Sequence, residues 1–276
     1  MGRVEGKVAF ISGVARGQGR SHAVRLAEEG ADIIGFDVCA DNPDVAYPLS
    51  REEDLQETVA LVEKHDRRIL TKVLDVRDAA GIRSFLDTSV AELGRLDIVL
   101  ANAGIMPTVG EERFRESAFH EGVAVMLNGV FNTVEPAIPH LKAGGRGGSI
   151  VLTSSTAGLK GTGQGDPGTM GYVAAKHGVV GLMRAWANVL AKDLIRVNTV
   201  HPTGVASPMI LNDAFAKYVE ENMDILDTLQ NPLPMPNNGM LLPSDVTDTI
   251  LHLVSEAGRY VTGSTVTVDA GFSNRV

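Results

Sequence analysis

Short apolar runs alternate along the chain with longer segments of helical periodicity. The apolar runs contain few charged residues, as expected of strands that are buried on both faces of a parallel sheet. They predict seven strands, at residues 7–12, 31–37, 69–74, 96–101, 148–154, 195–200 and 264–268. Between the strands, apolar residues recur every three or four positions, which predicts helices at 22–29, 52–65, 82–93, 118–141 and 172–190.

The regular alternation of strand and helix determines the expected fold class. Such a pattern predicts right-handed crossovers and a parallel sheet that is covered on both faces. We therefore expect an α/β protein with a Rossmann-type, doubly wound, seven-stranded parallel sheet in three α/β/α layers.

Two segments interrupt this alternation. Residues 38–50 form a polar, proline-containing insertion after the second strand. Residues 202–243 are rich in proline around a short helical stretch at 214–229, and a segment this long outside the pattern is more often a functional lid than a linker. We expect one domain over residues 1–276, with an insertion at 38–50 and a substrate lid at about 202–243.

Composition and charge exclude several classes of protein. The 276 residues include 25 Lys and Arg against 34 Asp and Glu, a net charge of −9, which argues against nucleic acid as a partner. There is one cysteine and no histidine pair at metal-ligand spacing, so neither a disulfide framework nor a metal site is expected. No apolar run is long enough to span a membrane, and no signal peptide is recognisable, so we expect a cytoplasmic protein.

A glycine-rich turn follows the first strand. Gly13, Gly17 and Gly19 allow the backbone to turn tightly and to approach a pyrophosphate, which the N–H groups of the next helix would bind. The spacing differs from the usual G-x-G-x-x-G fingerprint, so a plain tight turn remains an alternative.

Asp37 at the end of the second strand favours the nucleotide interpretation. It lies 24 residues after Gly13, near the offset expected of a carboxylate that binds the ribose hydroxyls of a dinucleotide. A carboxylate there repels a 2′-phosphate, which favours NAD over NADP. The alternatives are that Asp37 only starts a turn, or that Arg16 attracts a 2′-phosphate.

Tyr172 and Lys176 are four residues apart and therefore share one helix face. An ammonium beside a phenol favours the phenolate and lowers the phenol pKa, so that the phenol serves as a general acid and base. The Ser154–Ser155 pair ends the fifth strand, at the edge where α/β sheets place their sites, and could hold a substrate oxygen. Capping of the next turn is the alternative role for this serine pair.

Taken together, these features resemble the short-chain dehydrogenase/reductase superfamily over essentially the whole chain. The motifs that carry the resemblance are Gly13-x-x-x-Gly17-x-Gly19, Leu74-Asp75-Val76, Asn102-Ala103-Gly104, Asn128, Ser155, Tyr172-x-x-x-Lys176, Pro202-Thr203-Gly204, Thr262-Gly263 and Val268-Asp269-Ala270-Gly271. The insertion at 38–50 and the His201-Pro-Thr-Gly sequence are similar to the carveol-dehydrogenase-like, mycofactocin-associated branch. The glycine-containing loop before Tyr172 is longer than usual, which leaves the shape of the substrate pocket open.

The resemblance implies an oxidoreductase that transfers a hydride between NAD and a small apolar secondary alcohol or ketone. It implies that Tyr172 exchanges the proton, Lys176 lowers the Tyr172 pKa and binds the nicotinamide ribose, and Ser155 orients the substrate oxygen. Asn128 would connect Lys176 to solvent through water. The residues expected to bind the cofactor are Gly13, Arg16, Gly17, Gln18, Gly19, Asp37, Val38, Asp75, Val76, Asn102, Ala103, Gly104, Tyr172, Lys176, Pro202, Thr203, Gly204 and Val205.

The same resemblance implies partners for the chain. The branch is thought to hold NAD tightly and to regenerate it in place, with mycofactocin as a redox partner. The family usually forms homotetramers through the helices expected here at 118–141 and 172–190. Two alternatives remain open: an NADP-linked ketoacyl or steroid reductase, and a non-catalytic module that senses NAD through the 202–243 segment.

Overall fold

Seven parallel strands form one sheet in the computed structural model, which describes residues 2–161, 163–223, 230–235 and 239–275. The strand order is β3-β2-β1-β4-β5-β6-β7, which confirms the expected α/β, doubly wound fold. The strands are β1 (Val8–Ser12), β2 (Asp32–Asp37), β3 (Ile69–Val73), β4 (Ile98–Ala101), β5 (Gly148–Thr153), β6 (Ile195–Pro202) and β7 (Thr265–Val268). The order reverses between β1 and β4, and such a switch point leaves a crevice at the carboxyl ends of the strands.

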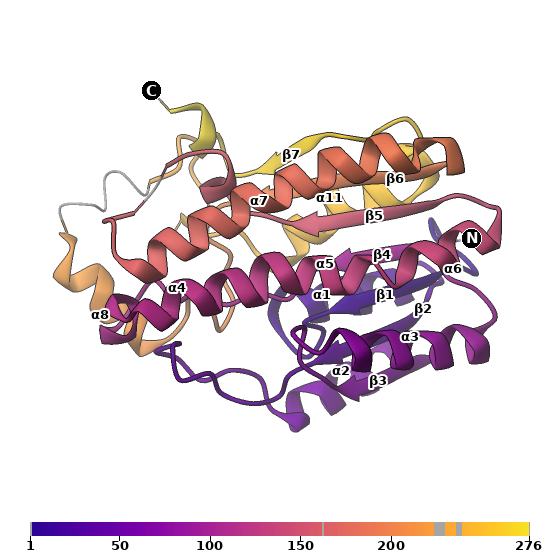
Figure 1. Ribbon diagram of the computed structural model, residues 1–276, viewed down its shortest axis with the longest axis horizontal. Coiled ribbons are helices and arrows are strands. Elements are labelled where there is room, and N and C mark those ends of the chain that lie inside the picture. Colours follow the sequence, from indigo (N-terminus) through magenta and orange to yellow (C-terminus); the bar gives the residue numbers. More distant parts are fainter. Residues whose placement is uncertain (1, 162, 224–229, 236–238, 276) are drawn as a thin grey trace.

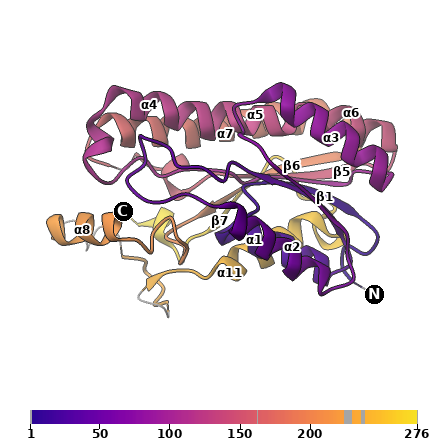
Figure 2. The same ribbon diagram turned by 90° about the horizontal axis from the view of Figure 1, so that it is seen from below.

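Helices cover both faces of the sheet (Figures 1 and 2). One layer contains α3 (Ala79–Leu93), α4 (Glu116–Val123), α5 (Gly129–Val134), α6 (Ala137–Gly144) and α7 (Pro167–Leu190). The other contains α1 (Gly17–Glu28), α2 (Glu52–Glu63) and α11 (Pro243–Val254). Each layer packs its own apolar cluster against the sheet, so the five inner strands are buried on both faces.

Two helices begin five residues earlier than the apolar periodicity predicts. The first, α1, starts at Gly17, inside the glycine-rich turn. Glycine has a low helix propensity, but close packing requires it there. The second, α7, starts at Pro167, where proline is favoured because its missing N–H would be unpaired in any case. The Asp166 side chain caps α7 by accepting a hydrogen bond from the Thr169 N–H at 2.9 Å.

The long helix predicted at 118–141 is divided into α4, α5 and α6. A π-helical turn over Ala124–Asn128 joins α4 to α5. Pro136 separates α5 from α6, since proline lacks the N–H that would continue the helix.

The sequence pattern did not predict α11, although its start signals are present. Pro243 occupies the first turn, and the Asp245 carboxylate accepts a hydrogen bond from the Leu242 N–H at 2.7 Å. Of the helical stretch predicted at 214–229, α8 (Asp213–Glu221) is formed, and residues 224–229 lie outside the described residues. The α8 helix projects away from the sheet at one end of the molecule (Figures 1 and 2). Within the described ranges, no helix is both long and apolar enough to cross a bilayer.

His22 on α1 is buried and provides a test of this packing. Its Nδ1 lies 2.7 Å from the Thr247 hydroxyl on α11, whereas Nε2 is buried without a partner among the described residues. Burial lowers the pKa of His22 from 6.5 to about 3. Between pH 6.5 and about 3, His22 therefore binds a proton in the unfolded chain but not in the folded one. The free energy of unfolding decreases as the pH falls through this range.

We expect His22 to lower the free energy of unfolding by about 2 kcal/mol when the pH falls from 7.5 to 5. Each pH unit below the pKa of the unfolded state contributes about 1.4 kcal/mol. Urea unfolding of the wild type and His22→Gln at both pH values measures this decrease. The Gln variant should lose less stability on acidification, and the exposed His65→Gln control should behave as the wild type. Equal losses in all three proteins would contradict the prediction.

Candidate active site

A cavity opens at the carboxyl ends of β1, β2 and β4, where the strand order reverses. Its walls include twelve of the residues expected to bind a cofactor, namely Gly13, Arg16, Gly17, Gln18, Gly19, Asp37, Val38, Asp75, Val76, Asn102, Ala103 and Gly104. The fold therefore brings together most of the residues that the sequence predicts to bind the cofactor.

The glycine-rich turn is shaped by positions that exclude a side chain. Gly13 adopts a left-handed φ of +70°. A Cβ on Gly19 would lie 1.9 Å from the Gly13 carbonyl oxygen, closer than any non-bonded contact allows. Glycine at 19 thus lets the first turn of α1 close against the loop. No side chain caps the N-terminus of α1, so its N–H groups remain available to an anion.

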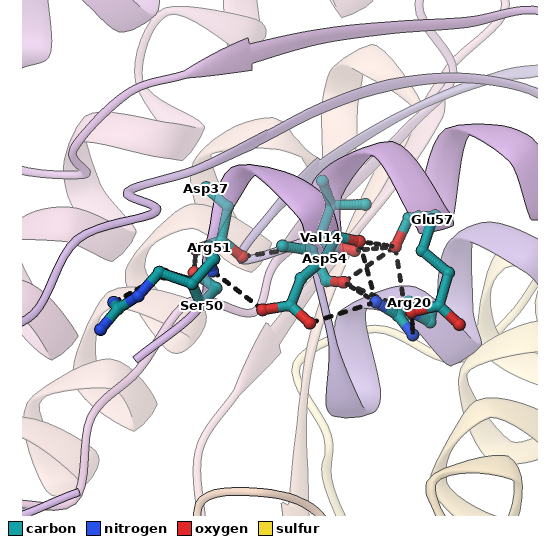
Figure 3. A network of polar contacts seen from close by, with 9 residues as sticks. Val14, Arg20, Asp37, Ser50, Arg51, Asp54 and Glu57 are labelled. Atoms are coloured by element: carbon teal, nitrogen blue, oxygen red, sulfur yellow. Dashed lines mark hydrogen bonds and ion pairs between the residues drawn. The ribbon is translucent and has the colours of Figure 1, made fainter. Parts of the chain in front are cut away.

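Side chains from two helices hold the carbonyl groups of this turn (Figure 3). The Ala15 carbonyl accepts hydrogen bonds from Arg20 Nε at 3.0 Å, from Arg20 Nη2 at 2.7 Å and from the Thr58 hydroxyl at 2.9 Å. An ion pair with Glu57 on α2 fixes the Arg20 guanidinium in turn. The loop is consequently held in shape by the protein itself.

The Asp37 carboxylate joins the turn to the insertion. Its Oδ2 accepts a hydrogen bond from the Ala15 N–H at 2.9 Å. Its Oδ1 accepts from the Val38 N–H at 2.9 Å and from the Ser50 hydroxyl at 2.6 Å. Two carboxylate oxygens have about four acceptor positions, so about one remains for a hydroxyl of a ligand.

The insertion at 38–50 forms one wall of the cavity and has several anchors. Arg16 Nη2 donates to the Pro48 carbonyl at 2.7 Å. The buried Tyr47 hydroxyl accepts from the Met106 N–H at 3.0 Å. Asn42 Nδ2 donates to Glu121 Oε2 on α4 at 2.9 Å. Arg16 is therefore committed to the insertion, which argues against its predicted alternative role as a 2′-phosphate ligand.

Asp75 also lines the cavity and is paired with Arg77. Although burial raises the pKa of Asp75, the hydrogen bonds and charge of Arg77 outweigh this effect and hold it below the usual value. Arg77 Nη1 also binds Glu121 Oε2 at 2.8 Å, which links this part of the cavity to the insertion through Asn42. Sequence reasoning did not select Arg77, Glu121 or Ser50, because their role depends on the path of the insertion.

Tyr172 and Ser155 meet beside the cavity. Burial raises the pKa of Tyr172, and a hydrogen bond with the Ser155 side chain opposes this effect. Ser155 Oγ also accepts from the Ala157 N–H at 3.2 Å, so it caps the following turn as well as contacting Tyr172. Ser154 binds the Lys176 carbonyl at 2.9 Å and is buried, which leaves Ser155 as the serine that contacts the phenol.

Lys176 is buried beneath the phenol. Its Nζ donates to the Thr153 carbonyl at 2.9 Å and lies 5.7 Å from the centre of the Tyr172 ring. Burial lowers the pKa of Lys176 to about 8. The pKa of Tyr172 is nevertheless raised, because removal of the phenolate from water has the largest effect on it.

Asn128 was wrong as a partner of Lys176. It is the last residue of the π-helical turn and is exposed. Met126, two residues earlier, is fully buried on the side of Lys176. Because two residues differ by about 200° around a helix, the two side chains point in nearly opposite directions.

Pro202 ends β6, and Thr203, Gly204 and Val205 follow it. None of these four residues is part of the cavity lining among the described residues. The next residues, Ser207, Pro208 and Met209, line it instead. The Gly204 carbonyl accepts from the Leu241 N–H at 2.9 Å, which ties the start of the 202–243 segment to its end. Residue type does not distinguish residues 202–205 from residues 207–209 in the sequence.

The cavity fits a dinucleotide by its own chemistry. Gln18 Oε1 is buried at its wall without a partner among the described residues, so a donor on a ligand would satisfy it. The free helix N-terminus suits a pyrophosphate, and Asp37 retains acceptor capacity for a ribose hydroxyl.

Comparisons with known proteins agree with this geometry. A family model described as enoyl-(acyl carrier protein) reductase matches residues 13–273. An uncharacterised oxidoreductase from Mycobacterium tuberculosis is 52% identical over 99% of this chain and 98% of its own length. The (-)-trans-carveol dehydrogenase of Rhodococcus erythropolis is 47% identical over 98% of this chain and 99% of its own.

A solved structure shows the same similarity. The crystal structure of carveol dehydrogenase from Mycobacterium avium in complex with NAD has a TM-score of 0.92, with 46% identity and full coverage of both chains (100% and 100%). The relatives span this chain end to end, and the motifs, the sheet order and the Ser155–Tyr172–Lys176 cluster lie within the matched region. The chain belongs to the short-chain dehydrogenase/reductase family and is an oxidoreductase of that family.

Proposed function

We propose that this protein is an NAD-dependent alcohol dehydrogenase and ketone reductase that acts on a small, apolar secondary alcohol of the carveol type. The observation that carries the proposal is the Ser155–Tyr172–Lys176 cluster beside a cavity suited to a dinucleotide. The similarity to a carveol dehydrogenase supports the substrate class.

NAD, when bound, supplies the hydride acceptor or donor. The protein's own groups handle the proton: Tyr172 exchanges it with the substrate oxygen, and Ser155 holds that oxygen beside the phenol. The raised pKa of Tyr172 keeps the phenol protonated at neutral pH, ready to donate during ketone reduction. As Tyr172 gives up this proton in ketone reduction, the Lys176 ammonium stabilises the developing phenolate. Alcohol oxidation is the reverse, with the phenolate taking the proton from the substrate hydroxyl.

The site favours NAD over NADP. Asp37 lines the cavity with a carboxylate that has no salt-bridge partner among the described residues, and this charge disfavours a 2′-phosphate. Like charges in a partly buried site repel strongly. An NADP-linked ketoacyl or steroid reductase is therefore the weaker candidate, and a non-catalytic sensor is weaker still because Ser155, Tyr172 and Lys176 are all retained.

The anchored insertion supports tight retention of NAD. Arg16, Ser50 and Asn42 fix it over the cavity at three places. A cofactor held in this way would be regenerated in place by a second redox partner, for which mycofactocin is our proposal. The cytoplasm is the compartment that we propose for this exchange.

A homotetramer is the assembly that we propose. Phe131 on α5 stacks on Trp186 of α7 at 6.0 Å between ring centres, and Phe131 remains 44% exposed. Val189, also on α7, is 61% exposed. Apolar groups on adjoining helices suit burial against another subunit.

The test begins with the protein as purified. We expect denaturation to release NAD and not NADP, in about one equivalent per chain. Added carveol should then reduce an artificial electron acceptor without added nucleotide. Exchange with labelled NAD would show how tightly the cofactor is held.

Three outcomes distinguish the candidates. NADPH-dependent reduction of ketoacyl or steroid ketones, with tighter binding of NADP, would favour the reductase. Absence of turnover for a panel of secondary alcohols, together with nucleotide-dependent binding of a partner protein, would favour the sensor. Turnover with carveol and bound NAD supports the dehydrogenase.

A further inference from the structure

Met126 lies at the place where a polar partner of Lys176 was expected. The point at which a Cβ would stand on Gly104 is 3.7 Å from Lys176 Nζ, 3.7 Å from Met126 Cγ and 3.9 Å from Met126 Sδ. The ammonium and the thioether thus border the same small space over Gly104. Met126 is 0% exposed, so the side of this space that it forms is closed to water.

The Lys176 ammonium has more donors than partners. An ammonium carries three N–H groups, and among the described residues only the Thr153 carbonyl accepts one of them. A thioether is a weak acceptor and does not replace water around a charge. The remaining N–H groups are thus without a strong protein acceptor.

The π-helical turn over Ala124–Asn128 sets which side chain faces Lys176. Such turns insert an extra residue into the helical register and are frequent at functional sites. Here Met126 points inward and Asn128 points to solvent. The chain therefore presents an apolar group to the ammonium although a polar one lies two residues away.

Charged and titratable groups around Lys176 do not account for its lowered pKa. Tyr172 lies on the same helix, and on β6 the nearest is His201, whose pKa is lowered mainly by burial and further by the Lys176 charge. His177, next along α7, is turned to its own helix backbone. From β5 and the turn after it come the uncharged Thr153 and Ser155.

The helix α4 also packs on α7, and its charges are committed elsewhere. Glu121 is paired with Arg77, and His120 lies 3.8 Å from Glu116 at the surface. The shift at Lys176 has burial as its one cause. The apolar wall that includes Met126 is therefore the feature that acts on the ammonium.

We propose that Met126 is a positioning residue of the Tyr172–Lys176 pair, which excludes water from the helix side of the Lys176 ammonium and so sets the upper pH at which Lys176 remains charged. Its consequence for turnover rests on the proposed function. Its effect on Lys176 itself does not.

The first measurement is a titration of Lys176 by NMR. The chain has eight lysines, so protein labelled with ¹³C at lysine Cε gives few signals, and the one lost in Lys176→Met is that of Lys176. In the wild type we expect a pKa of about 8. Met126→Leu should keep this value, whereas Met126→Asn, which makes room for water, should raise it by about one unit or more towards the ordinary lysine value.

Met126→Gln, which has the length of methionine, replaces the Asn variant if that protein does not fold. The seven other lysine signals report whether each variant retains the fold. The proposal is overturned if the polar variants titrate as the wild type does, or if Met126→Leu moves the pKa as much as they do.

The second measurement is the pH profile of a single turnover in the reducing direction, of bound NADH with the ketone that corresponds to carveol. In the wild type, the rate should fall as the pH rises through about 8, because neutral Lys176 no longer stabilises the phenolate. In Met126→Asn this fall should occur at a higher pH, by the same shift as in the titration. If the wild type shows no turnover at all, the proposed function fails while the NMR result still decides the role of Met126.

Discussion

Replacing Tyr172 by Phe is expected to lower kcat by about 10²–10⁴-fold, the contribution usual for general acid–base catalysis. The substitution removes only the hydroxyl that exchanges the substrate proton, and the ring still fills its place beside Lys176. NAD should remain bound in the same amount, because the cavity walls that hold it do not depend on this hydroxyl. Steady-state rates with a carveol-type alcohol and NAD content after purification measure both effects.

Tyr260→Phe is the matched control, since Tyr260 is 88% exposed and distant in sequence from the site. It should behave as the wild type in both measurements. An unchanged kcat in Tyr172→Phe would falsify the catalytic assignment. Loss of NAD together with activity would instead indicate that the phenol supports the cofactor site.

Replacing Gly19 by Ala should weaken NAD binding by about 100-fold, equivalent to about 3 kcal/mol, the upper range for steric overpacking. The new methyl would lie 1.9 Å from the Gly13 carbonyl oxygen and 2.9 Å from Asn102 Nδ2. Neither atom is free to move: Gly13 is part of the backbone, and Asn102 Nδ2 donates to the Ser12 carbonyl at 3.2 Å. The turn must open, which displaces the N–H groups that would bind the pyrophosphate.

Calorimetric titration of nucleotide-free protein with NAD measures the loss of affinity. Gly181→Ala is the control, because a Cβ at this position in α7 meets nothing within 4 Å. That variant should retain NAD affinity and gain about 0.5–1 kcal/mol of stability from the better helix former. Wild-type affinity in Gly19→Ala would contradict the role assigned to the turn.

The seven strands and their parallel arrangement were accessible from sequence because buried parallel strands consist of uninterrupted apolar runs. Helix boundaries were less accessible. The early starts of α1 and α7 depend on glycine and proline, which usually signal loops, yet here lie within the first turn. The start of α11 carries a proline and an acidic capping residue. The sequence therefore contained the signals for this helix, although the helix was not predicted.

For the site, the motif residues after β1, β2 and β4 were predictable because the fold brings the carboxyl ends of these strands together. Asn128 was not, since a π-helical turn changes which residues face inward and leaves no mark in the apolar periodicity. The direction of the Tyr172 pKa was equally inaccessible. A sequence shows that Lys176 is near, but only the structure shows how far both groups are removed from water.

The three hydrogen bonds accepted by Asp37 limit how this protein could change its cofactor. A smaller neutral residue at 37 would remove the charge that disfavours NADP. The same change would release the Ala15 N–H of the glycine-rich turn and the Ser50 hydroxyl of the insertion. Nucleotide preference and retention therefore share one side chain, and an evolutionary switch to NADP would have to pass through a variant that holds any dinucleotide poorly, unless a second substitution restores the lost acceptor first.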